Sequence, residues 1–366
     1  MNRYRIRLNP ARSPTYTLAM TSAPQFQRLA FFTRLLDAVP AAERYRLAAE
    51  QITHAEALGF DAAWVAQHHF HEHEGGLPSP FVFLAHLAAR TRRIRLGTGI
   101  ITLPLELPVR VAEDAIVLDL ISDKRLELGV GNGGNPSAFA GFELDSEQRH
   151  DLFVRNLSRL RAALQGKPVT GGDTLYPQHP ELAERIWQAT FSVSGGRRAG
   201  LAGDGLMLSR TQPRSPEAPR APLSDLQDPI IDAYLAALPP ARAPRIVGSR
   251  TMFVADSRAE ALRLADIGLR TQLRRSVDRG YQPPGDTLHD LITAFDVHVG
   301  TPTEVIASLR ADRTLIRVTD LAVQVHSVDP PHPLVLRSME LVAQEVAPAF
   351  GWQRRDSRSA ELEKVA

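Results

Sequence analysis

Short apolar runs alternate with amphipathic stretches along most of the chain, from about residue 28 to about residue 346. Apolar runs bounded by glycine and polar residues predict buried strands, and the stretches between them repeat apolar residues with the spacing of helices. The predicted strands cover residues 28–33, 61–67, 94–101, 125–131, 186–192, 205–209, 245–255 and 320–327. Strand and helix alternate about eight times, which is typical of a parallel sheet.

The helix before the second predicted strand has the clearest pattern. Tyr45, Ala48, Ile52 and Ala55 share one face, and Gly59 stands where a left-handed C-terminal cap would end the helix. The other predicted helices cover residues 80–89, 109–121, 146–164, 196–202, 257–271, 303–311 and 333–346. Eight strand–helix units within roughly 320 residues predict a (β/α)8 barrel, the TIM barrel, with insertions, rather than an open doubly wound sheet.

Three segments do not match a strand–helix unit. Residues 1–25 show little periodicity, residues 212–244 are rich in proline, and residues 274–296 present no apolar face. Long insertions of this kind are usually lids or linkers. We therefore expect an N-terminal extension over residues 1–25, a single barrel domain over residues 26–350, and a solvated C-terminal tail over residues 351–366.

Composition narrows the possible classes of function. The 366 residues are 43% hydrophobic and 23% charged, as is ordinary for a soluble enzyme. The absence of cysteine excludes disulfides, thiolate metal sites and a cysteine nucleophile. A formal charge of +2, spread along the chain, does not support binding to nucleic acid. Neither a signal peptide nor a run of 18 apolar residues is found, so we expect a cytoplasmic protein without a membrane partner.

The stretch WVAQHHFHEHEGG, residues 64–76, carries four histidines, His68, His69, His71 and His73. It follows the second predicted strand, and barrel active sites form at the carboxyl ends of the strands. Three interpretations are open: a metal site, an acid/base centre, or an exposed polar loop. Adjacent loop histidines without further ligands at a defined spacing are a weak metal signal, and we expect no metal site.

Several motifs between residues 59 and 142 occur together. Gly-Phe-Asp ends the first helix, the second strand ends in His-His-Phe, the third ends in Leu-Pro, and Pro-Val-Arg-Val-Ala-Glu-Asp opens the third helix. As a set they resemble the flavin-dependent monooxygenases of the bacterial luciferase family, in particular the luciferase α-subunit. Beyond residue 145 the similarity thins to TFSVSGGRRAGLAGDGLMLSR and GTPTEVIASL. The resemblance implies a (β/α)8 barrel that binds reduced FMN or a deazaflavin at its C-terminal face.

The resemblance also implies residue roles. His68 matches the family's acid/base residue beside the flavin, and an imidazole with an ordinary pKa of about 6.5 can donate and accept a proton near neutral pH. Gly99 and Ile100 match a non-proline cis peptide that several members carry beneath the isoalloxazine ring. Gln67 replaces the glutamate usual in luciferase, so a carboxylate partner for the imidazole is missing.

The glycine-rich stretch RLELGVGNGG follows the fourth strand. Gly131, Asn132 and Gly133 would let the backbone approach a ring or a phosphate closely, because glycine adds no side chain and tolerates positive φ. An ordinary flexible turn between strand and helix is the other interpretation. Luciferase has a reactive cysteine followed by arginine here, so light emission is not expected.

The fifth strand leads through a polar turn straight into a helix. Hydroxyl groups, free N–H groups, the helix dipole and a guanidinium can converge there on an anion. The residues expected to hold a cofactor phosphate are Ser192, Ser194, Gly195, Gly196 and Arg197. A plain helix cap by Ser194 remains the alternative.

The leading hypothesis is a monooxygenase that uses O2 and reduced FMN to oxygenate a small organic substrate. The chain shows no dinucleotide fingerprint, so a separate flavin reductase would supply the reduced FMN. The alternatives are an F420-dependent hydride transferase, a non-catalytic flavin-binding protein and a metal-dependent barrel hydrolase. We also expect a homodimer formed through the helices after the second and third strands, with Phe83, Leu87, Val117 and Leu118 supplying apolar surface.

Overall fold

The computed structural model describes residues 25–354, except residue 216 and residues 278–284. Most of the expected N-terminal extension and C-terminal tail, and part of the segment 274–296, therefore lie outside the described residues. Within the described part, no helix has the length and apolar character needed to cross a bilayer.

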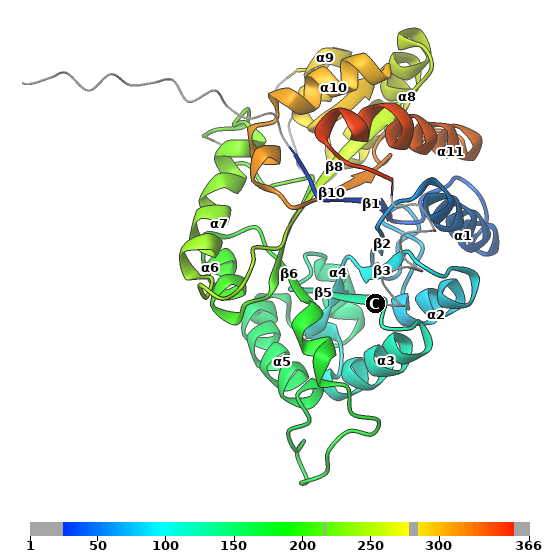
Figure 1. The fold of residues 1–366 in the computed structure, drawn as a ribbon. Helices are drawn as coiled ribbons and strands as arrows, with labels where there is room; N and C mark the ends of the chain where they lie inside the picture. Colours follow the sequence, from blue (N-terminus) through cyan, green and yellow to red (C-terminus); the bar gives the residue numbers. More distant parts are fainter. Residues whose placement is uncertain (1–24, 216, 278–284, 355–366) are drawn as a thin grey trace, which may run out of the picture.

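Parallel strands close into a barrel, which confirms the predicted fold class (Figure 1). Around the ring the order is β1, β2, β3, β5, β6, β7, β8 and β10, and β10 pairs with β1 to close it. The strands are β1 (Arg28–Thr33), β2 (Ala62–Val65), β3 (Arg95–Thr98), β4 (Ile101–Thr102), β5 (Leu126–Gly131), β6 (Ile186–Ala189), β7 (Gly205–Leu208), β8 (Ile246–Val254), β9 (Val297–Gly300) and β10 (Asp320–Gln324).

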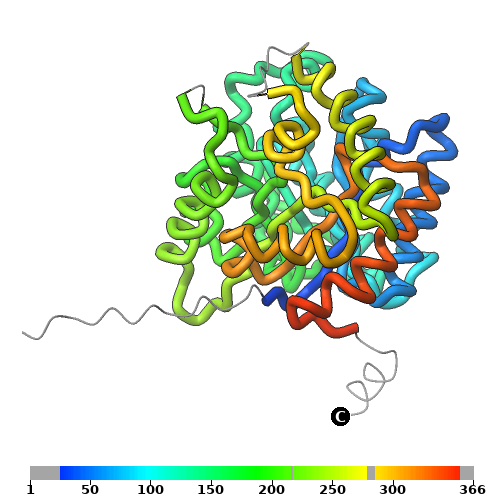
Figure 2. The backbone as a smooth tube through the Cα atoms, turned by 90° about the horizontal axis from the view of Figure 1, so that it is seen from above, coloured from blue at the N-terminus to red at the C-terminus, as the bar shows by residue number. Residues whose placement is uncertain are grey.

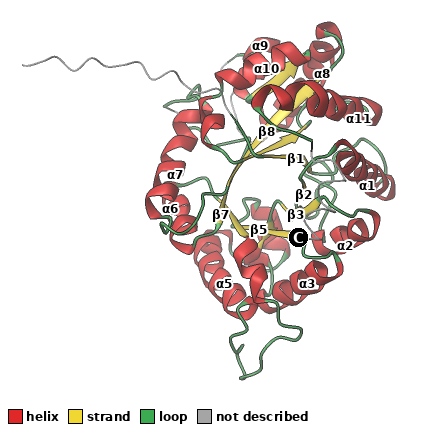
Figure 3. Cartoon of the chain, viewed as in Figure 1, coloured by secondary structure: helices red, strands yellow, loops and turns green. Residues whose placement is uncertain are grey.

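Helices form the outer layer around the strands (Figure 3). They are α1 (Ala41–Leu58), α2 (Pro80–Arg90), α3 (Pro108–Ile121), α4 (Pro136–Gly141), α5 (Arg149–Leu164), α6 (Val193–Ala202), α7 (Leu223–Ala237), α8 (Arg258–Val277), α9 (Leu288–Ala294), α10 (Pro302–Ala311) and α11 (His332–Leu341). The last helix, α11, packs beside α1, so the outer layer also closes (Figure 2).

The structure corrects the prediction at three places. The third predicted strand is interrupted: β3 pairs with β2 and β5, whereas β4 pairs with β5 only. The proline-rich segment 212–244 is not a plain insertion, because α7 covers the barrel there with Ile230, Ile231 and Tyr234 buried. Prolines around and inside this helix hid its apolar period. Strand β9 was not predicted; it extends the sheet by pairing with the end of β8.

Two tryptophans fill the centre of the barrel. The rings of Trp64 and Trp187 meet edge to face at 5.7 Å, and both side chains are buried. Glycines on neighbouring strands make room for them, because a Cβ at Gly97 would lie 2.2 Å from the Trp64 ring and one at Gly205 would lie 2.1 Å from the Trp187 ring. The barrel interior is therefore a packed core, and ligands must bind above it, at the carboxyl ends of the strands.

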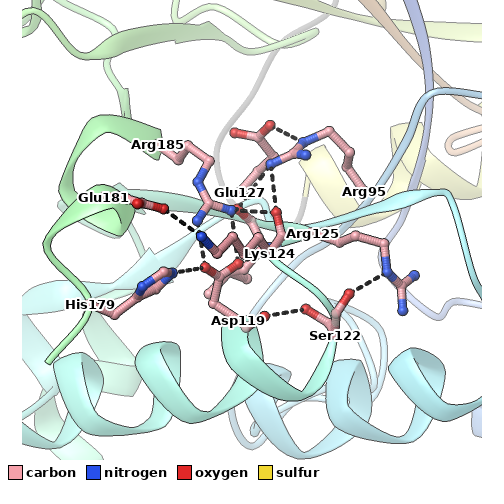
Figure 4. A network of polar contacts seen from close by, with 10 residues as sticks. Arg95, Asp119, Ser122, Lys124, Arg125, Glu127, His179, Glu181 and Arg185 are labelled. Atoms are coloured by element: carbon pink, nitrogen blue, oxygen red, sulfur yellow. Dashed lines mark hydrogen bonds and ion pairs between the residues drawn. The ribbon is translucent and has the colours of Figure 1, made fainter. Parts of the chain in front are cut away.

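A network of charged residues ties the elements together at the opposite, amino-terminal end of the barrel (Figure 4). Asp119, at the end of α3, is fully buried and accepts hydrogen bonds from the Leu126 N–H at 2.9 Å and from Arg185 Nη1 at 2.8 Å. Its other oxygen lies 2.6 Å from His179 Nε2. One carboxylate thus joins α3, the start of β5 and the segment before β6.

Candidate active site

His68 lies at the carboxyl end of β2, at the mouth of the barrel. Its backbone N–H donates to the Leu77 carbonyl at 3.0 Å, and this hydrogen bond joins the start of the histidine loop to its end. Its ring packs against Gly75, where a Cβ would come within 2.7 Å of His68 Cδ2. Gly75 has a φ of +152°, a conformation that favours glycine, so the absence of a side chain both permits this backbone conformation and leaves room for the His68 ring.

The His68 imidazole is neutral at physiological pH. Burial lowers the pKa of His68 to about 3, and nearby Arg34, His326 and His69 add to the effect. Gln67 does not face this ring. Its Oε1 accepts from the Thr102 N–H at 2.7 Å and its Nε2 donates to Glu106 at 2.7 Å. This corrects the expectation of a ring that titrates near neutral pH: His68 is a weak base here, and its neutral ring donates a hydrogen bond from one nitrogen and accepts one at the other, with no carboxylate supplied by Gln67.

The remainder of the histidine loop is held by contacts to its surroundings. His71 Nε2 lies 2.8 Å from the Ser137 hydroxyl, and Glu72 forms an ion pair of 2.8 Å with Arg44. The Glu74 carboxylate accepts a hydrogen bond from the Asn135 side chain. No group of three or more His, Cys, Asp or Glu side chains is placed to hold a metal ion anywhere in the described part of the chain.

Apolar residues form a floor above the two tryptophans. Phe32, Ile100 and Ala189 pack on the barrel core at this level. The Gly99–Ile100 peptide bond is cis, as expected from the resemblance. A Cβ at Gly131 would lie 3.1 Å from the Ile100 side chain, so a glycine here avoids crowding Ile100.

A polar atom stands at the edge of this floor without a partner. The Asn132 Oδ1 atom is buried and accepts no hydrogen bond. Unpaired buried acceptors are uncommon in folded proteins. The neighbouring Gly133 has a φ of +70°, and a Cβ there would lie 2.4 Å from Thr102 Cγ2, so the turn needs glycine. A flat ring that carries an N–H donor, such as an isoalloxazine, fits both the floor and the unsatisfied acceptor.

The turn after β6 caps helix α6, but through Ser192 rather than Ser194. Ser192 Oγ accepts from the Gly195 N–H at 3.1 Å, and Ser194 Oγ lies 3.2 Å from Ser192 Oγ. The N–H groups of Val193 and Ser194 belong to the first turn of the helix and have no intrahelical acceptor. Hydroxyl and N–H donors thus remain exposed at this turn.

Two of the residues expected at the phosphate have other neighbours. A Cβ at Gly196 would lie 2.4 Å from the Ile230 carbonyl oxygen, so Gly196 lets α6 approach α7 closely. Arg197 is exposed and lines a groove between α5 and α6 together with Ser194 and Arg161. The structure therefore brings Ser192, Ser194 and Gly195 together at the turn and places Gly196 and Arg197 farther along the helix.

Sequence analysis missed a group of basic residues at the mouth. Arg34 follows β1, Arg210 follows β7 and His326 follows β10, and the three interact electrostatically. Burial lowers the pKa of Arg210 to about 9 and that of His326 to about 4. None of them belongs to a recognisable motif. The available signal was their position, since Arg34 and Arg210 come just past the end of a predicted strand and His326 is the next-to-last residue of one, where barrel sites form.

Comparison with known proteins agrees with this geometry. Residues 25–319 match the sequence profile of the luciferase-like monooxygenases. The chain is 30% identical over 324 residues to 4-hydroxyprotoasukamycin monooxygenase of Streptomyces nodosus subsp. asukaensis, which covers 81% of this chain and 84% of that protein.

Solved structures share the fold. Monooxygenase RslO1 from Streptomyces bottropensis superposes with a TM-score of 0.72 at 26% identity, covering 88% of this chain and 100% of that one. An F420-dependent secondary alcohol dehydrogenase shares the fold at 18% identity with a TM-score of 0.63, covering 90% of this chain and 100% of that one. The profile match spans most of the chain, and the chain therefore belongs to the luciferase-like monooxygenase family.

Proposed function

We propose that this protein is an FMN-dependent monooxygenase. It uses O2 and reduced FMN, delivered by a separate flavin reductase, to oxygenate a small organic substrate. The observation that carries the proposal is the buried, unpaired Asn132 Oδ1 beside the floor of Ile100 and Ala189. The similarity to a protein named a monooxygenase supports oxygen chemistry over the F420-dependent alternative, whose named example shares only the fold.

Each part of the mouth has a role in this proposal. Bound reduced FMN supplies the electrons that activate O2. The floor would support the ring, Asn132 Oδ1 would accept a hydrogen bond from it, and the donors of Ser192 and Ser194 would hold the phosphate. The neutral imidazole of His68 would donate the proton of one ring nitrogen while its other nitrogen accepts one, so that no imidazolium accumulates. The burial of His68 limits the access of water to that proton.

Replacing Ser194 by alanine tests the phosphate contact. A hydrogen bond to a charged group contributes about 1.5 to 3 kcal/mol, so the variant should bind reduced FMN roughly 10- to 100-fold more weakly. Riboflavin, which lacks the phosphate, should bind the parent and the variant equally. Arg197→Ala is the companion variant, because Arg197 lines the same groove as Ser194 but lies farther along α6; a loss of affinity there would add its guanidinium to the phosphate site. Titration of flavin fluorescence under anaerobic conditions measures these affinities.

The same titrations separate the alternatives. Equal FMN affinity in the parent and the Ser194→Ala variant would remove the turn from the site. Tighter binding of reduced F420 than of reduced FMN, with hydride transfer in the absence of O2, would replace the proposal by the F420-dependent one. Flavin binding without any consumption of O2 would indicate a non-catalytic flavin-binding protein.

The assembly is proposed to be a homodimer through α2 and α3. Three residues expected to supply the contact, Phe83, Leu87 and Leu118, are instead buried in the core, because those faces of the helices pack on the barrel. The outward faces carry other large apolar side chains beside Val117, which is half exposed. These are Val82, Leu107, Leu120 and Ile121, with exposures between 42% and 72%. Of these residues, Val82, Val117 and Ile121 line one groove between α2 and α3, and exposed apolar side chains gathered in this way support an interaction site.

Charging this surface should separate the protomers. The parent is expected to sediment as a dimer at micromolar concentration, and the double variant Val117→Asp/Ile121→Asp as a folded monomer. Val154→Asp, an equally exposed position on α5, is the control and should stay dimeric. A parent that sediments as a monomer would contradict the proposed assembly.

A further inference from the structure

Arg210 is a buried cation with almost no compensation. It follows β7, and only 6% of its surface is exposed. Its one hydrogen bond runs from Nη1 to Thr251 Oγ1 at 3.3 Å, and no ion pair to it is found among the described residues. The Thr251 hydroxyl donates its own hydrogen to the His326 carbonyl at 2.6 Å, so it serves Arg210 only as a neutral acceptor.

The carboxylates that act on Arg210 from a distance are engaged elsewhere. Asp296 binds Arg214 through both oxygens, at 2.8 and 2.9 Å. Asp329 faces His326 Nδ1 at 2.8 Å. Arg34 opposes Arg210, because its positive charge lowers the pKa of the Arg210 guanidinium further. The two cations therefore repel each other at this side of the mouth.

Unsatisfied polar atoms lie at the end of β10 and just after it. Strand β10 pairs with β8, which carries Thr251, the acceptor of the hydrogen bond from Arg210. Ser327 Oγ and Gln324 Oε1, at the end of β10, are buried and have no hydrogen-bond partner. Gln324 pairs with Thr251 across β8 and β10, so it belongs to the same level of the barrel as the acceptor of Arg210. An unpaired hydroxyl and an unpaired amide oxygen thus lie near the residue that accepts the hydrogen bond from Arg210.

A second buried arginine shows what a structural role requires. Arg250, on β8, is fully buried, and its guanidinium pairs with Asp312 and also donates to Gln227 at 3.0 Å. Burying a guanidinium without such a partner is destabilising. The cost at Arg210 is offset when a ligand brings the missing negative charge.

We propose that the substrate carries an oxyanion, in the simplest case a carboxylate, which binds Arg210 on the side of the mouth formed by β7, β8 and β10. This side lies across the ring from β3, which leads to Ile100 in the floor, so the anion would anchor the substrate beside the proposed flavin position. The chemistry of the substrate rests on the proposed function, whereas binding of the anion does not require flavin.

Thermal unfolding of the flavin-free full-length protein tests the binding. The probes are benzoate, benzenesulfonate and phenyl phosphate, and neutral benzamide is the matched control. At least one anion should raise the unfolding midpoint of the parent more than benzamide does. The Arg210→Met variant should bind that anion about 10- to 100-fold more weakly, as expected for lost charge-assisted hydrogen bonds. The best probe of the three identifies the kind of oxyanion. Equal effects of the anions and benzamide, or a benefit that persists in Arg210→Met, would overturn the proposal.

The ligand-free variants give an independent readout. Arg210→Met removes an uncompensated charge and should raise the unfolding midpoint. Arg250→Met leaves the Asp312 carboxylate without its cation and should lower the midpoint. A lowered midpoint in both would show that Arg210 has a structural partner, and the proposal would fail. Reduced FMN should bind parent and Arg210→Met alike. Weaker binding of reduced FMN by Arg210→Met than by the parent would assign Arg210 to the cofactor and overturn its substrate role. If neither protein binds FMN, that result would count against the proposed function only.

Discussion

Replacing His68 by alanine is expected to lower oxygenation by roughly 10²- to 10⁴-fold, the usual effect of removing an acid/base group. Affinity for reduced FMN should change little, because the floor and the turn after β6 are untouched. Oxygen that is not transferred to a substrate leaves as hydrogen peroxide. The measurement is therefore the rate at which hydrogen peroxide is released after reduced enzyme is mixed with oxygen, which needs no substrate, and this rate should rise in the variant.

His73→Ala is the control for this experiment, since His73 is exposed in the same loop. It should behave like the parent. An unchanged rate of peroxide release in His68→Ala, together with a changed rate in His73→Ala, would reassign the role within the loop.

The lowered pKa of His68 should also make the stability of the protein depend on pH in a direction that can be measured. In the unfolded chain a histidine titrates near pH 6.5, whereas the folded protein keeps His68 neutral down to about pH 3. Between these values the unfolded state binds the additional proton, so stability is lost as the pH falls. The unfolding midpoint of His68→Gln should consequently drop less than that of the parent between pH 7 and pH 5. Equal drops would show that His68 is solvated.

Replacing Asp119 by alanine is expected to lower the free energy of unfolding by about 3 to 5 kcal/mol, the range for breaking a buried ion pair. The variant leaves Arg185 and His179 without their carboxylate and removes the acceptor of the Leu126 N–H. Equilibrium unfolding in urea measures the change. Because this network lies at the amino-terminal end of the barrel, folded variant protein should bind reduced FMN normally.

Glu181→Ala is the matched control, because Glu181 pairs with Lys124 in the same network but at the exposed surface (Figure 4). Exposed pairs contribute little to stability. An Asp119→Ala protein as stable as Glu181→Ala would mean that water replaces the carboxylate.

Much of the fold was predictable, because strands buried on both faces leave continuous apolar runs in the sequence. Residues 125–131 were expected to form a strand, and β5 covers Leu126–Gly131. The helix α7 was missed because Pro229 lies inside it and further prolines flank it. Strand β9 is short and pairs only with the end of β8, so its signal is weak.

The site was predictable only where a motif follows a strand. His68 was found in this way, and its position at the end of β2 agrees with the expectation. Arg210 and His326 escaped because they are far apart in sequence and meet only when the ring closes. The neighbours of Gly196 are set by how closely α6 packs on α7, which the sequence of α6 alone does not reveal.

The tryptophan pair at the barrel centre gives the protein an optical reporter. Trp64 and Trp187 lie directly beneath the floor of Phe32, Ile100 and Ala189, whereas Trp352 donates to Asp61 before the start of β2, at the other end of the barrel. A chromophore seated on the floor would accept excitation energy from the two nearby indoles more readily than from the distant one. Occupancy of the mouth can thus be followed as a loss of intrinsic emission, with Trp352 contributing the least sensitive part of the signal.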